Sequence, residues 1–446
     1  MSNRQGIVPV REATIVRACE DIEFPKMALV KQEWKTNSIE GDEIMTHVIS
    51  SVESLPLETL QSGAKIAIGV GSRGIANLPA IVEGVVHAFQ ERGFEPFIFP
   101  AMGSHGGATS VGQQHKLEAL GVTESTVGCH IESTMETVEV GRTPERDIPV
   151  VFDKIAAAAD AIVPINRIKP HTDFQGKVES GLSKMLVIGM GKQRGAKIAH
   201  QWSVDWSLRD MLPEISKMLI DSLPVIGGIA LVENQYHDTM IIEGVPADNF
   251  LQREAELLVQ AYEVMPKIPF DELDLLIVDR MGKDISGSGM DTNVIGRLVY
   301  GFDEPEPEYP EIKRIYLRNL TSVSQGNASG VGSADIIHQR VLERMDSSKT
   351  LINTITASSL AGARVPAAVE SDRAAVTACL STVGLIDSKD VRVVRITDTM
   401  HLEKMFVSEG LLNDVATASN LTQLGGLAPF EFDTNGDFKR DTPDKS

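Results

Sequence analysis

Three histidines and one lysine offer the clearest chemistry in this chain, because each lies in a glycine-rich segment after an apolar, strand-like run. They are His105 in GSHGGAT, His171 in KPHTDFQGK, Lys184 in SGLSKMLVIGMG and His200 in GAKIAHQWS. Histidine can carry a proton or a metal ion near neutral pH, and lysine can become a covalent anchor. We therefore expect these four residues to divide proton transfer, metal binding and covalent attachment among them.

Two glycine-rich turns come directly after expected strands. Gly103 opens the turn before His105, where backbone without side chains lets a ligand approach closely. The other turn carries Ser72 and Arg73, ahead of an expected helix whose first N–H groups favour anions. It matches neither a dinucleotide fingerprint nor a Walker loop, so a tight turn with a solvated arginine remains an equal alternative.

The segment that leads to Lys184 is dense in residue types that catalyse reactions. The charged and titratable members before it are Arg167, Lys169, His171, Asp173 and Lys177. Lys184 itself lies in a mostly apolar run, and burial would lower its pKa and free the amine as a nucleophile. The following GMGKQRGAK could be a phosphate loop but lacks the usual ending of one, so a helix connection with exposed cations is an equal alternative.

A second polar, glycine-rich segment, VDRMGKDISGSGMDTNVIGR, follows the expected strand at 273–280. Its candidate substrate contacts are Lys283, Asp291, Asn293 and Arg297. A loop of this kind at a strand end predicts one wall of a cleft facing the first domain, with a long surface loop as the alternative. His237, after another expected strand, is a weaker candidate for the same cleft.

The elements that must position these residues alternate between short apolar runs and amphipathic stretches, which is typical of α/β proteins. Expected strands cover 65–71, 96–102, 161–166, 227–234, 273–280, 313–320 and 391–397. Expected helices cover 77–91, a segment after a capping box at Ser110 and Gln113, and 247–263. Several strands are apolar on consecutive residues, as in sheets covered on both faces.

We therefore predict an α/β fold of two domains, with mostly parallel sheets covered by helices and an active site in the interdomain cleft. A proline-bearing boundary near 264–272 divides an N-terminal catalytic and cofactor-binding domain, 1–265, from a C-terminal α/β domain, 266–432. The polar tail, 433–446, is expected to be disordered.

Composition narrows the classes of function. The 446 residues carry a net charge of −20, which disfavours nucleic acid and anionic lipid as partners. The three scattered cysteines support neither a thiolate zinc site nor a disulfide framework. Since no signal peptide and no membrane-length apolar run is visible, the cytoplasm is the expected location.

The order of these motifs resembles the nickel-dependent lactate racemase family over roughly residues 60–300. The carrying features are SRG after the first strand, the GSHGG turn, PH before a glycine-bearing stretch, and the step of 16 residues from Lys184 to His200. The resemblance implies an isomerase, a racemase or epimerase of a 2-hydroxy acid that works by proton-coupled hydride transfer.

The same resemblance implies a cofactor and a role for each residue. The cofactor is a nickel-pincer nucleotide, pyridinium-3-thioamide-5-thiocarboxylic acid mononucleotide, attached covalently to Lys184, with His200 as the protein ligand of nickel. His105 and His171 correspond to the two acid–base histidines. Ser72, Arg73 and Gly103 correspond to cofactor contacts, and Arg73 also to a substrate contact. The expected partners are pincer-synthesis and nickel-insertion proteins, and a homo-oligomer is possible.

The chain departs from the family's lactate enzymes in two places. Gly106 and Gly107 stand where those enzymes commonly have arginine and proline, and the stretch from His171 to Lys184 is longer. Both changes would reshape the substrate pocket. We therefore expect a 2-hydroxy acid larger than lactate, such as a sugar acid or a dicarboxylic hydroxy acid.

Two other functions fit the same residues. One is a zinc metallohydrolase in which His105, His171 and His200 bind the metal and Asp173 or Glu179 acts as base. The other is a non-catalytic homologue that binds an anion or nucleotide. Lys184 discriminates between the racemase and the hydrolase, because a zinc hydrolase has no use for it.

Overall fold

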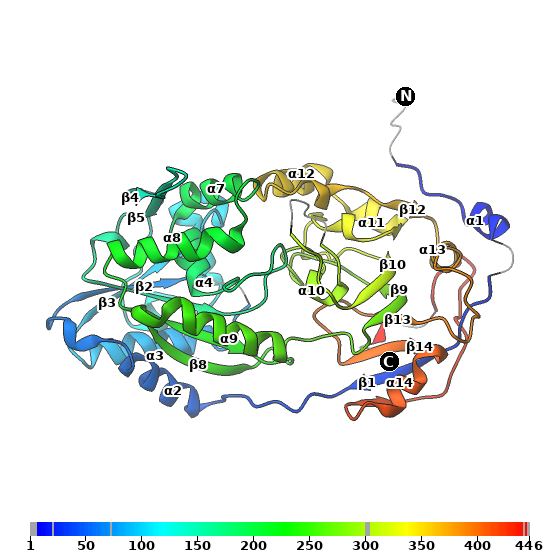
Figure 1. Ribbon diagram of the computed structural model, residues 1–446, viewed down its shortest axis with the longest axis horizontal. Helices are drawn as coiled ribbons and strands as arrows, with labels where there is room; N and C mark the ends of the chain where they lie inside the picture. The colour runs from blue at the N-terminus through cyan, green and yellow to red at the C-terminus, as the bar shows by residue number, and fades with distance from the viewer. Residues whose placement is uncertain (1–6, 20–21, 72–73, 299–303, 440–441, 444–446) are drawn as a thin grey trace. The chain divides into compact units, whose positions relative to one another are not determined.

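The computed structural model describes residues 7–19, 22–71, 74–298, 304–439 and 442–443. The chain folds as two compact units (Figure 1). One, which we call the five-stranded unit, runs from Thr36 to Met265, and the other, the eight-stranded unit, combines the chain before Thr36 with the chain from Pro266 onward. The chain passes from one unit to the other between residues 35 and 36 and again between residues 265 and 266.

The five-stranded unit is built on a mostly parallel sheet with the order β3-β2-β6-β7-β8. Neighbouring strands run parallel from β3 to β7, and β8 is antiparallel to β7. The strands are β2 (Lys65–Val70), β3 (Glu95–Pro100), β6 (Ala161–Arg167), β7 (Gly227–Glu233) and β8 (Thr239–Pro246). A separate antiparallel pair consists of β4 (Thr137–Arg142) and β5 (Pro149–Asp153).

Side chains of one strand divide between the two faces of this sheet, as the pleat requires. In β2, Ile66 and Ile68 pack into one hydrophobic cluster, whereas Ala67 packs into the other. Helices α2 and α3 contribute to the first cluster, and α8 and α9 contribute to the second (Figure 1). The consecutive apolar residues of β2 are therefore explained by helices on both faces.

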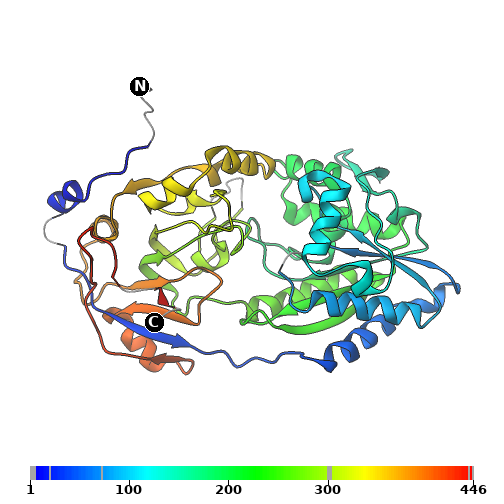
Figure 2. The ribbon, with the colours of Figure 1, turned by 180° about the vertical axis from the view of Figure 1, so that it is seen from behind.

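The helices of this unit connect the strands, and α4 is seen in cyan in Figure 2. Their bounds are α2 (Asp42–Glu53), α3 (Leu78–Gln90), α4 (Ser110–Ala119), α5 (Glu124–Val127), α6 (Leu182–Lys184), α7 (Lys192–Trp202), α8 (Leu208–Ser222) and α9 (Phe250–Val264). A π-helical turn, Met185–Gly189, joins α6 to α7. Thr109, not Ser110, caps α4, because the Thr109 hydroxyl accepts from the N–H of Gly112.

The strand order places a topological switch point between β2 and β6, because the chain goes from β2 to β3 on one side and later returns to β6 on the other. Open α/β sheets bind ligands in the crevice at the carboxyl ends of the strands at such a point. Since β2, β3 and β6 are parallel, the segments that follow Val70, Pro100 and Arg167 emerge at this same edge.

The eight-stranded unit has the order β12-β11-β10-β9-β13-β14-β1-β15. It is parallel from β12 to β13 and antiparallel from β13 to β15. The strands are β1 (Met27–Gln32), β9 (Glu272–Val278), β10 (Glu311–Leu317), β11 (Ile336–His338), β12 (Ala367–Val369), β13 (Val393–Ile396), β14 (Lys404–Ser408) and β15 (Leu421–Gln423).

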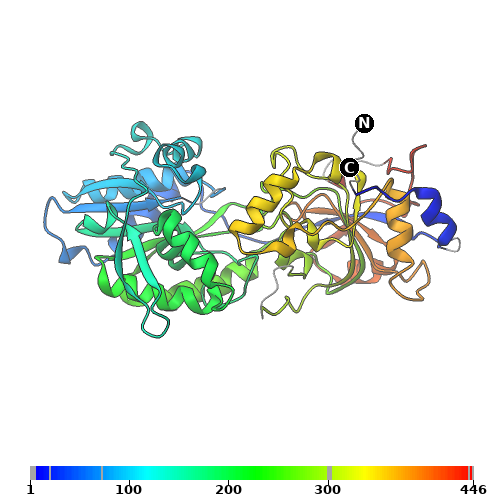
Figure 3. The same cartoon turned by 90° about the horizontal axis from the view of Figure 1, so that it is seen from above.

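Helices flank this second sheet, and α13 is seen in orange beside its strands in Figure 3. The helices are α1 (Glu12–Ala18), α10 (Thr292–Ile295), α11 (Gln339–Arg344), α12 (Ser347–Thr356), α13 (Asp372–Leu380) and α14 (Leu412–Thr417). Buried Ala375 and Cys379 of α13 pack with Leu275 and Ile277 of β9 and with Tyr316 of β10. None of the described helices is long and apolar enough to cross a membrane.

The α/β class, the two units and the mostly parallel sheets agree with the sequence. The assignment of both chain ends differs. Residues 27–32, expected in the N-terminal domain, form β1 and pair with β14 and β15 of the other unit. Within the tail expected to be disordered, Asp433 accepts from the N–H of Asn435 and of Asp437, and Phe438 stacks on Phe430 and Phe432. This turn and its aromatic contacts order the described tail residues.

Candidate active site

The turn after β3 presents His105 to solvent and is held from two directions. The Gln113 side chain donates to the carbonyl of Gly103 at 2.8 Å, and the N–H of Gly103 donates to the carbonyl of Gly189 at 2.9 Å. Gly103 has φ +57° and packs so closely that an added Cβ would lie 3.2 Å from the carbonyl oxygen of Ile188. The His105 turn is therefore fixed against the segment that contains Lys184.

The chain after β6 forms an excursion that returns beside its own start. Lys169 and Ser180 pair through their backbones, and the Asn166 side chain donates to the carbonyl of Gly181 at 2.7 Å. The excursion between them carries His171, which is only 8% exposed and stacks on Phe174. The length of this stretch, a departure from the family pattern, thus forms an ordered enclosure around His171.

Glu179 lies within this excursion and binds its backbone. Its buried carboxylate accepts from the N–H of His171 at 2.6 Å, the N–H of Gly176 at 2.9 Å and the hydroxyl of Tyr262 at 3.1 Å. Burial raises its pKa, and these donors oppose that rise. From the sequence, Glu179 was considered only as a possible base of a hydrolase. In the structure, its carboxylate fixes the backbone of His171.

Lys184 and His171 meet directly, Nζ against Nε2. The other ring nitrogen of His171, Nδ1, accepts from the backbone N–H of Asp173 at 3.0 Å. A neutral ring that accepts at Nδ1 carries its proton on Nε2. Because a charged ammonium has no lone pair to accept that proton, the contact requires Lys184 as a neutral amine.

The electrostatics of the cluster bring the neutral amine within reach, because the pKa of Lys184 is far below that of an ordinary lysine. Burial, the largest cause, and neighbouring Lys169 lower the pKa of Lys184 to about 8, against opposing effects of two carboxylates. Burial lowers the pKa of His171 well below its usual value, and the charges of Lys184 and Lys169 lower it further. Burial and Lys184 also lower the pKa of His200 to about 4. These causes place the three side chains in one electrostatic cluster. Both imidazoles are neutral at neutral pH, whereas the Lys184 amine becomes mostly neutral only above about pH 8.

Glu254 was missed by the sequence interpretation, although it holds the segment that contains Lys184. Its fully buried carboxylate accepts from the N–H of Ser183 at 3.0 Å and from the Ser183 hydroxyl, and an added Cβ on Gly181 would lie 2.0 Å from its Oε1. Burial raises the pKa of Glu254 to about 7. A signal was present, because Glu254 lies on the same stripe of α9 as buried Phe250 and Leu257.

His200 lies half-buried near the end of α7, a helix that begins at Lys192. Lys192 was expected among exposed cations, but it is fully buried and pairs with buried Asp153 at 3.0 Å. Its ammonium also contacts the carbonyl of Pro100 at the end of β3. This buried ion pair ties the start of α7 to the strand that leads to His105.

Ser72 and Arg73, the expected anion contacts after β2, lie outside the described residues. The chain just after them is held by an ion pair at the carboxyl edge of the sheet. Arg167 pairs with Glu233 and donates to the carbonyl of Gly74 at 2.8 Å, and Glu233 accepts from the N–H of Ala76 at 2.8 Å. This pair fixes the chain that follows the switch-point strand β2.

The four expected substrate contacts after β9 belong to the eight-stranded unit. Asp291 caps α10 and accepts from both the N–H and the side-chain amide of Asn293, and the Lys283 ammonium contacts the carbonyl of Gly287. Arg297 pairs with Asp335 at 2.9 Å and donates to the carbonyls of Ser333 and Ile312. These contacts are all within the eight-stranded unit and stabilise it. A role of the four residues in binding substrate stays a prediction.

A pocket of about 280 Å³ lies beside His105 in the five-stranded unit. It is lined by Gly71, Met102, His105, Gly106, Lys116, Ala119 and Leu120, and we call it the His105 pocket. Since Gly71 follows β2 and Met102 follows β3, it opens at the carboxyl edge of the sheet. The described lining lies on the β3 side of the switch point, at the edge where open α/β sheets bind ligands.

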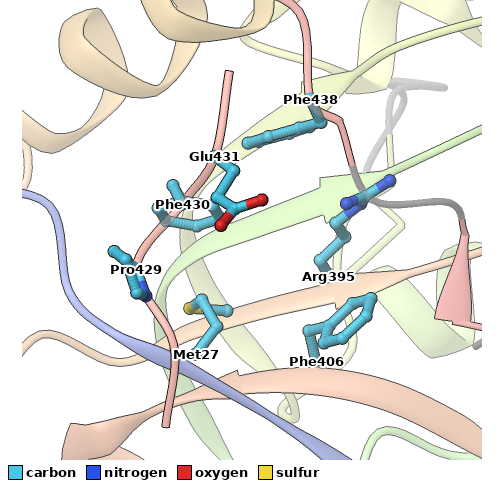
Figure 4. Close-up of a pocket in the computed structure, with 7 residues that line it drawn as sticks. All are labelled: Met27, Arg395, Phe406, Pro429, Phe430, Glu431 and Phe438. Carbon is cyan, nitrogen blue, oxygen red and sulfur yellow. The ribbon is translucent and has the colours of Figure 1, made fainter. Parts of the chain in front are cut away.

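A second cavity, of about 20 Å³, lies under the C-terminal segment of the eight-stranded unit (Figure 4). Its lining residues are Met27, Arg395, Phe406, Pro429, Phe430, Glu431 and Phe438. The Arg395 guanidinium packs 4.6 Å from the Phe438 ring and pairs with Asp279. Because this volume holds about one water molecule, the cavity is a packing gap rather than a substrate site.

Among the described residues, one group of at least three could hold a metal ion without rearrangement: His338, Asp372 and Asp437. Arg318 already binds Asp372 with its Nε at 2.8 Å and its Nη2 at 2.6 Å, and Arg340 lies against both carboxylates. A cation there would have to displace two guanidinium groups. The three histidines of the hydrolase alternative form no such group in the described part of the chain.

No protein-family model and no curated protein matches this chain. A solved structure of a Thermotoga maritima protein aligns with TM-score 0.45 and 14% identity, over 64% of this chain and 72% of that chain. The lactate racemase apoprotein from Thermoanaerobacterium thermosaccharolyticum aligns with TM-score 0.40 and 14% identity, over 80% of this chain and 82% of that one. Similarity at this level carries no inference about function, which must come from the residues of this chain.

Proposed function

We propose that this chain is a racemase or epimerase of a 2-hydroxy acid that carries a nickel-pincer nucleotide on Lys184. The observation that carries the proposal is the direct contact of the Lys184 amine with Nε2 of His171. It joins the proposed attachment residue to a proposed acid–base residue, and the tautomer of His171 requires that amine to be neutral. A neutral amine is the form that can be acylated.

The residues present fit this cofactor. Lys184 offers its amine for the thioamide bond, and His200 offers a neutral imidazole, the form that ligates metal. Gly103 allows the His105 turn to lie against the chain next to Lys184. When bound, the pincer ring supplies reversible hydride acceptance, chemistry that no amino-acid side chain provides.

Inversion of a carbon that bears a hydroxyl and a hydrogen needs two proton carriers. One exchanges the hydroxyl proton of one enantiomer, and the other exchanges that of the opposite enantiomer. His171 would exchange that proton at Nε2, the nitrogen turned to Lys184. To accept a proton there, the ring must hold its own proton on Nδ1 and release the N–H of Asp173. Glu179 holds the backbone of His171, so the ring stays oriented through the exchange. His105, on the separate turn after β3, is the second proton carrier.

The glycines after His105 account for the departure from lactate enzymes. Gly106 has φ +67°, and an added Cβ would lie 2.4 Å from the backbone carbon of Gly112, so this turn does not accept the family's arginine. The turn instead borders the His105 pocket. This supports a substrate larger than lactate.

The decisive experiment is the mass of the Lys184 peptide, with metal analysis, after co-expression with the pincer-synthesis and nickel-insertion proteins. We expect a covalent adduct on Lys184 together with nickel. Unmodified Lys184 with stoichiometric zinc would identify the hydrolase instead. An unmodified lysine without metal, in a preparation where a known family member is loaded, would identify the non-catalytic homologue.

A further inference from the structure

The larger substrate expected from the sequence is either a sugar acid or a dicarboxylic hydroxy acid, and the His105 pocket favours the second class. We propose that the substrate is a dicarboxylic 2-hydroxy acid whose second carboxylate binds Lys116, and this rests on the function proposed above. The reacting end of the molecule lies at His105, its carbon chain fills the pocket, and its far end meets the Lys116 ammonium. Lys116 is therefore a specificity-determining residue.

The first argument is size. About 10–15 Å³ of space open to the centre of a water molecule holds one water, so a pocket of about 280 Å³ has room for many. Lactate, with one methyl group beyond its reacting carbon, would leave most of that space to solvent. A chain of two or three further carbons that ends in a charged group uses it.

The second argument is the chemistry of the walls. Met102, Ala119 and Leu120 supply apolar surface, and the two glycines supply only backbone. None of the described lining residues has a hydroxyl or amide side chain. A sugar acid would place several hydroxyl groups against the apolar side chains of these described walls, and each group left unsatisfied costs about 1–3 kcal/mol. A methylene chain meets the same walls without that cost.

The third argument is charge. Lys116 projects from α4 and lines the pocket, and no carboxylate among the described residues pairs with it. Lys116 is exposed, so its ammonium can be reached by a ligand from solvent. An ammonium at the end of a mostly apolar pocket is a partner for an anionic group.

Binding tests the inference without requiring turnover. The full-length chain, purified after co-expression with the pincer-synthesis proteins, is titrated with 2-hydroxyglutarate and with 2-hydroxyvalerate, which lacks the second carboxylate. We expect the diacid to bind at least about tenfold more tightly, as befits a charged hydrogen bond. Lys116→Ala should abolish this preference, and Lys116→Glu should reverse it. His115→Ala, on the neighbouring exposed residue of α4, should keep it.

Three results would overturn the inference. They are equal binding of the two acids by the unaltered chain, a preference that survives Lys116→Ala, and tighter binding of gluconate than of 2-hydroxyglutarate. Racemisation is followed separately by chiral chromatography. A chain that binds the diacid through Lys116 but never inverts it would contradict the proposed function and leave only the assignment of Lys116 as the carboxylate-binding residue.

Discussion

Glu254 of α9 accepts hydrogen bonds from the backbone N–H and the hydroxyl of Ser183, the residue directly before Lys184. Glu254 and Ser183 are separated by 71 residues in the sequence. Tertiary structure, rather than local sequence, therefore fixes the start of the short helix α6, which contains Lys184. A carboxylate at the first turn of a helix satisfies N–H groups that have no partner within the helix. The π-helical turn that follows Lys184 continues from this fixed start.

Replacing Glu254 should therefore disturb Lys184 without touching it. Glu254→Ala leaves buried N–H and hydroxyl donors unsatisfied, and we expect the free energy of unfolding to fall by about 3 kcal/mol. The fraction of Lys184 that becomes modified on co-expression should fall as well. Urea denaturation and peptide mass measure the two effects. Glu263→Gln, at an exposed position of the same helix, should change neither.

The raised pKa of Glu254, about 7, predicts a pH dependence of stability. An ordinary glutamate ionises near 4.5, so between about pH 4.5 and 7 the folded state binds more protons than the unfolded state. Stability should therefore decrease as pH rises through this window. Glu254→Gln removes the titration, and its loss of stability over the same window should be smaller than that of the parent. Parallel slopes for the two proteins would contradict a buried, titrating Glu254.

The pKa of Lys184, lowered to about 8, predicts an unusually reactive amine before the cofactor is attached. Acylation of Lys184 by a small activated ester should rise with pH around 8, and exposed Lys217 serves as the comparison residue. Quantitative peptide mass spectrometry after brief labelling reports both residues in one sample. If the Lys184 profile matched that of Lys217, burial would not lower the pKa of the Lys184 amine and its proposed reactivity would be refuted.

Much of the fold could be predicted from the sequence, because buried parallel strands are marked by continuous apolar runs. The strands at Lys65–Val70, Ala161–Arg167 and Glu272–Val278 are confirmed within a residue or two at most ends. The strand Met27–Gln32 was not expected, because its partners lie near residue 400 and nothing local marks that pairing. Short edge strands such as Leu421–Gln423 were missed for the same reason.

The candidate site likewise contains residues that the sequence indicates and residues that only the folded structure reveals. Residue types and spacing drew attention to His171 and Lys184, and the structure brings them into contact. The groups that hold them, Glu179 and Glu254, are single acidic residues whose partners are mostly backbone N–H groups. A backbone donor leaves no mark on the sequence, so such residues emerge only once the chain is folded.

The two histidines should be separable by the isomer from which the reaction starts. If His171 and His105 serve opposite directions of inversion, His171→Asn and His105→Asn should each lower turnover by about 10²–10⁴-fold, the usual contribution of a general acid or base. Each enantiomer is supplied in turn with a deuterium label, and mass spectrometry follows release or retention of that label. The enantiomer that no longer reacts shows which direction of inversion the replaced histidine serves. Exposed His87→Asn serves as the control. Full turnover in both variants would show that the roles are misassigned.

The buried pair of Lys192 and Asp153 predicts a coupled loss of stability and of metal. Lys192→Met leaves a fully buried carboxylate without its cation, which costs about 3–5 kcal/mol. Asp153→Asn should relieve part of that cost, because an amide oxygen can still accept from the N–H groups of Ile155 and Ala156 without carrying charge. A double-mutant cycle measured by urea denaturation should therefore be strongly non-additive. Lys192 also fixes the start of the helix that ends near His200, so Lys192→Met should lower the bound nickel, while Lys197→Met, on the exposed face of that helix, should not. Additive effects on stability would mean that the two side chains do not depend on each other.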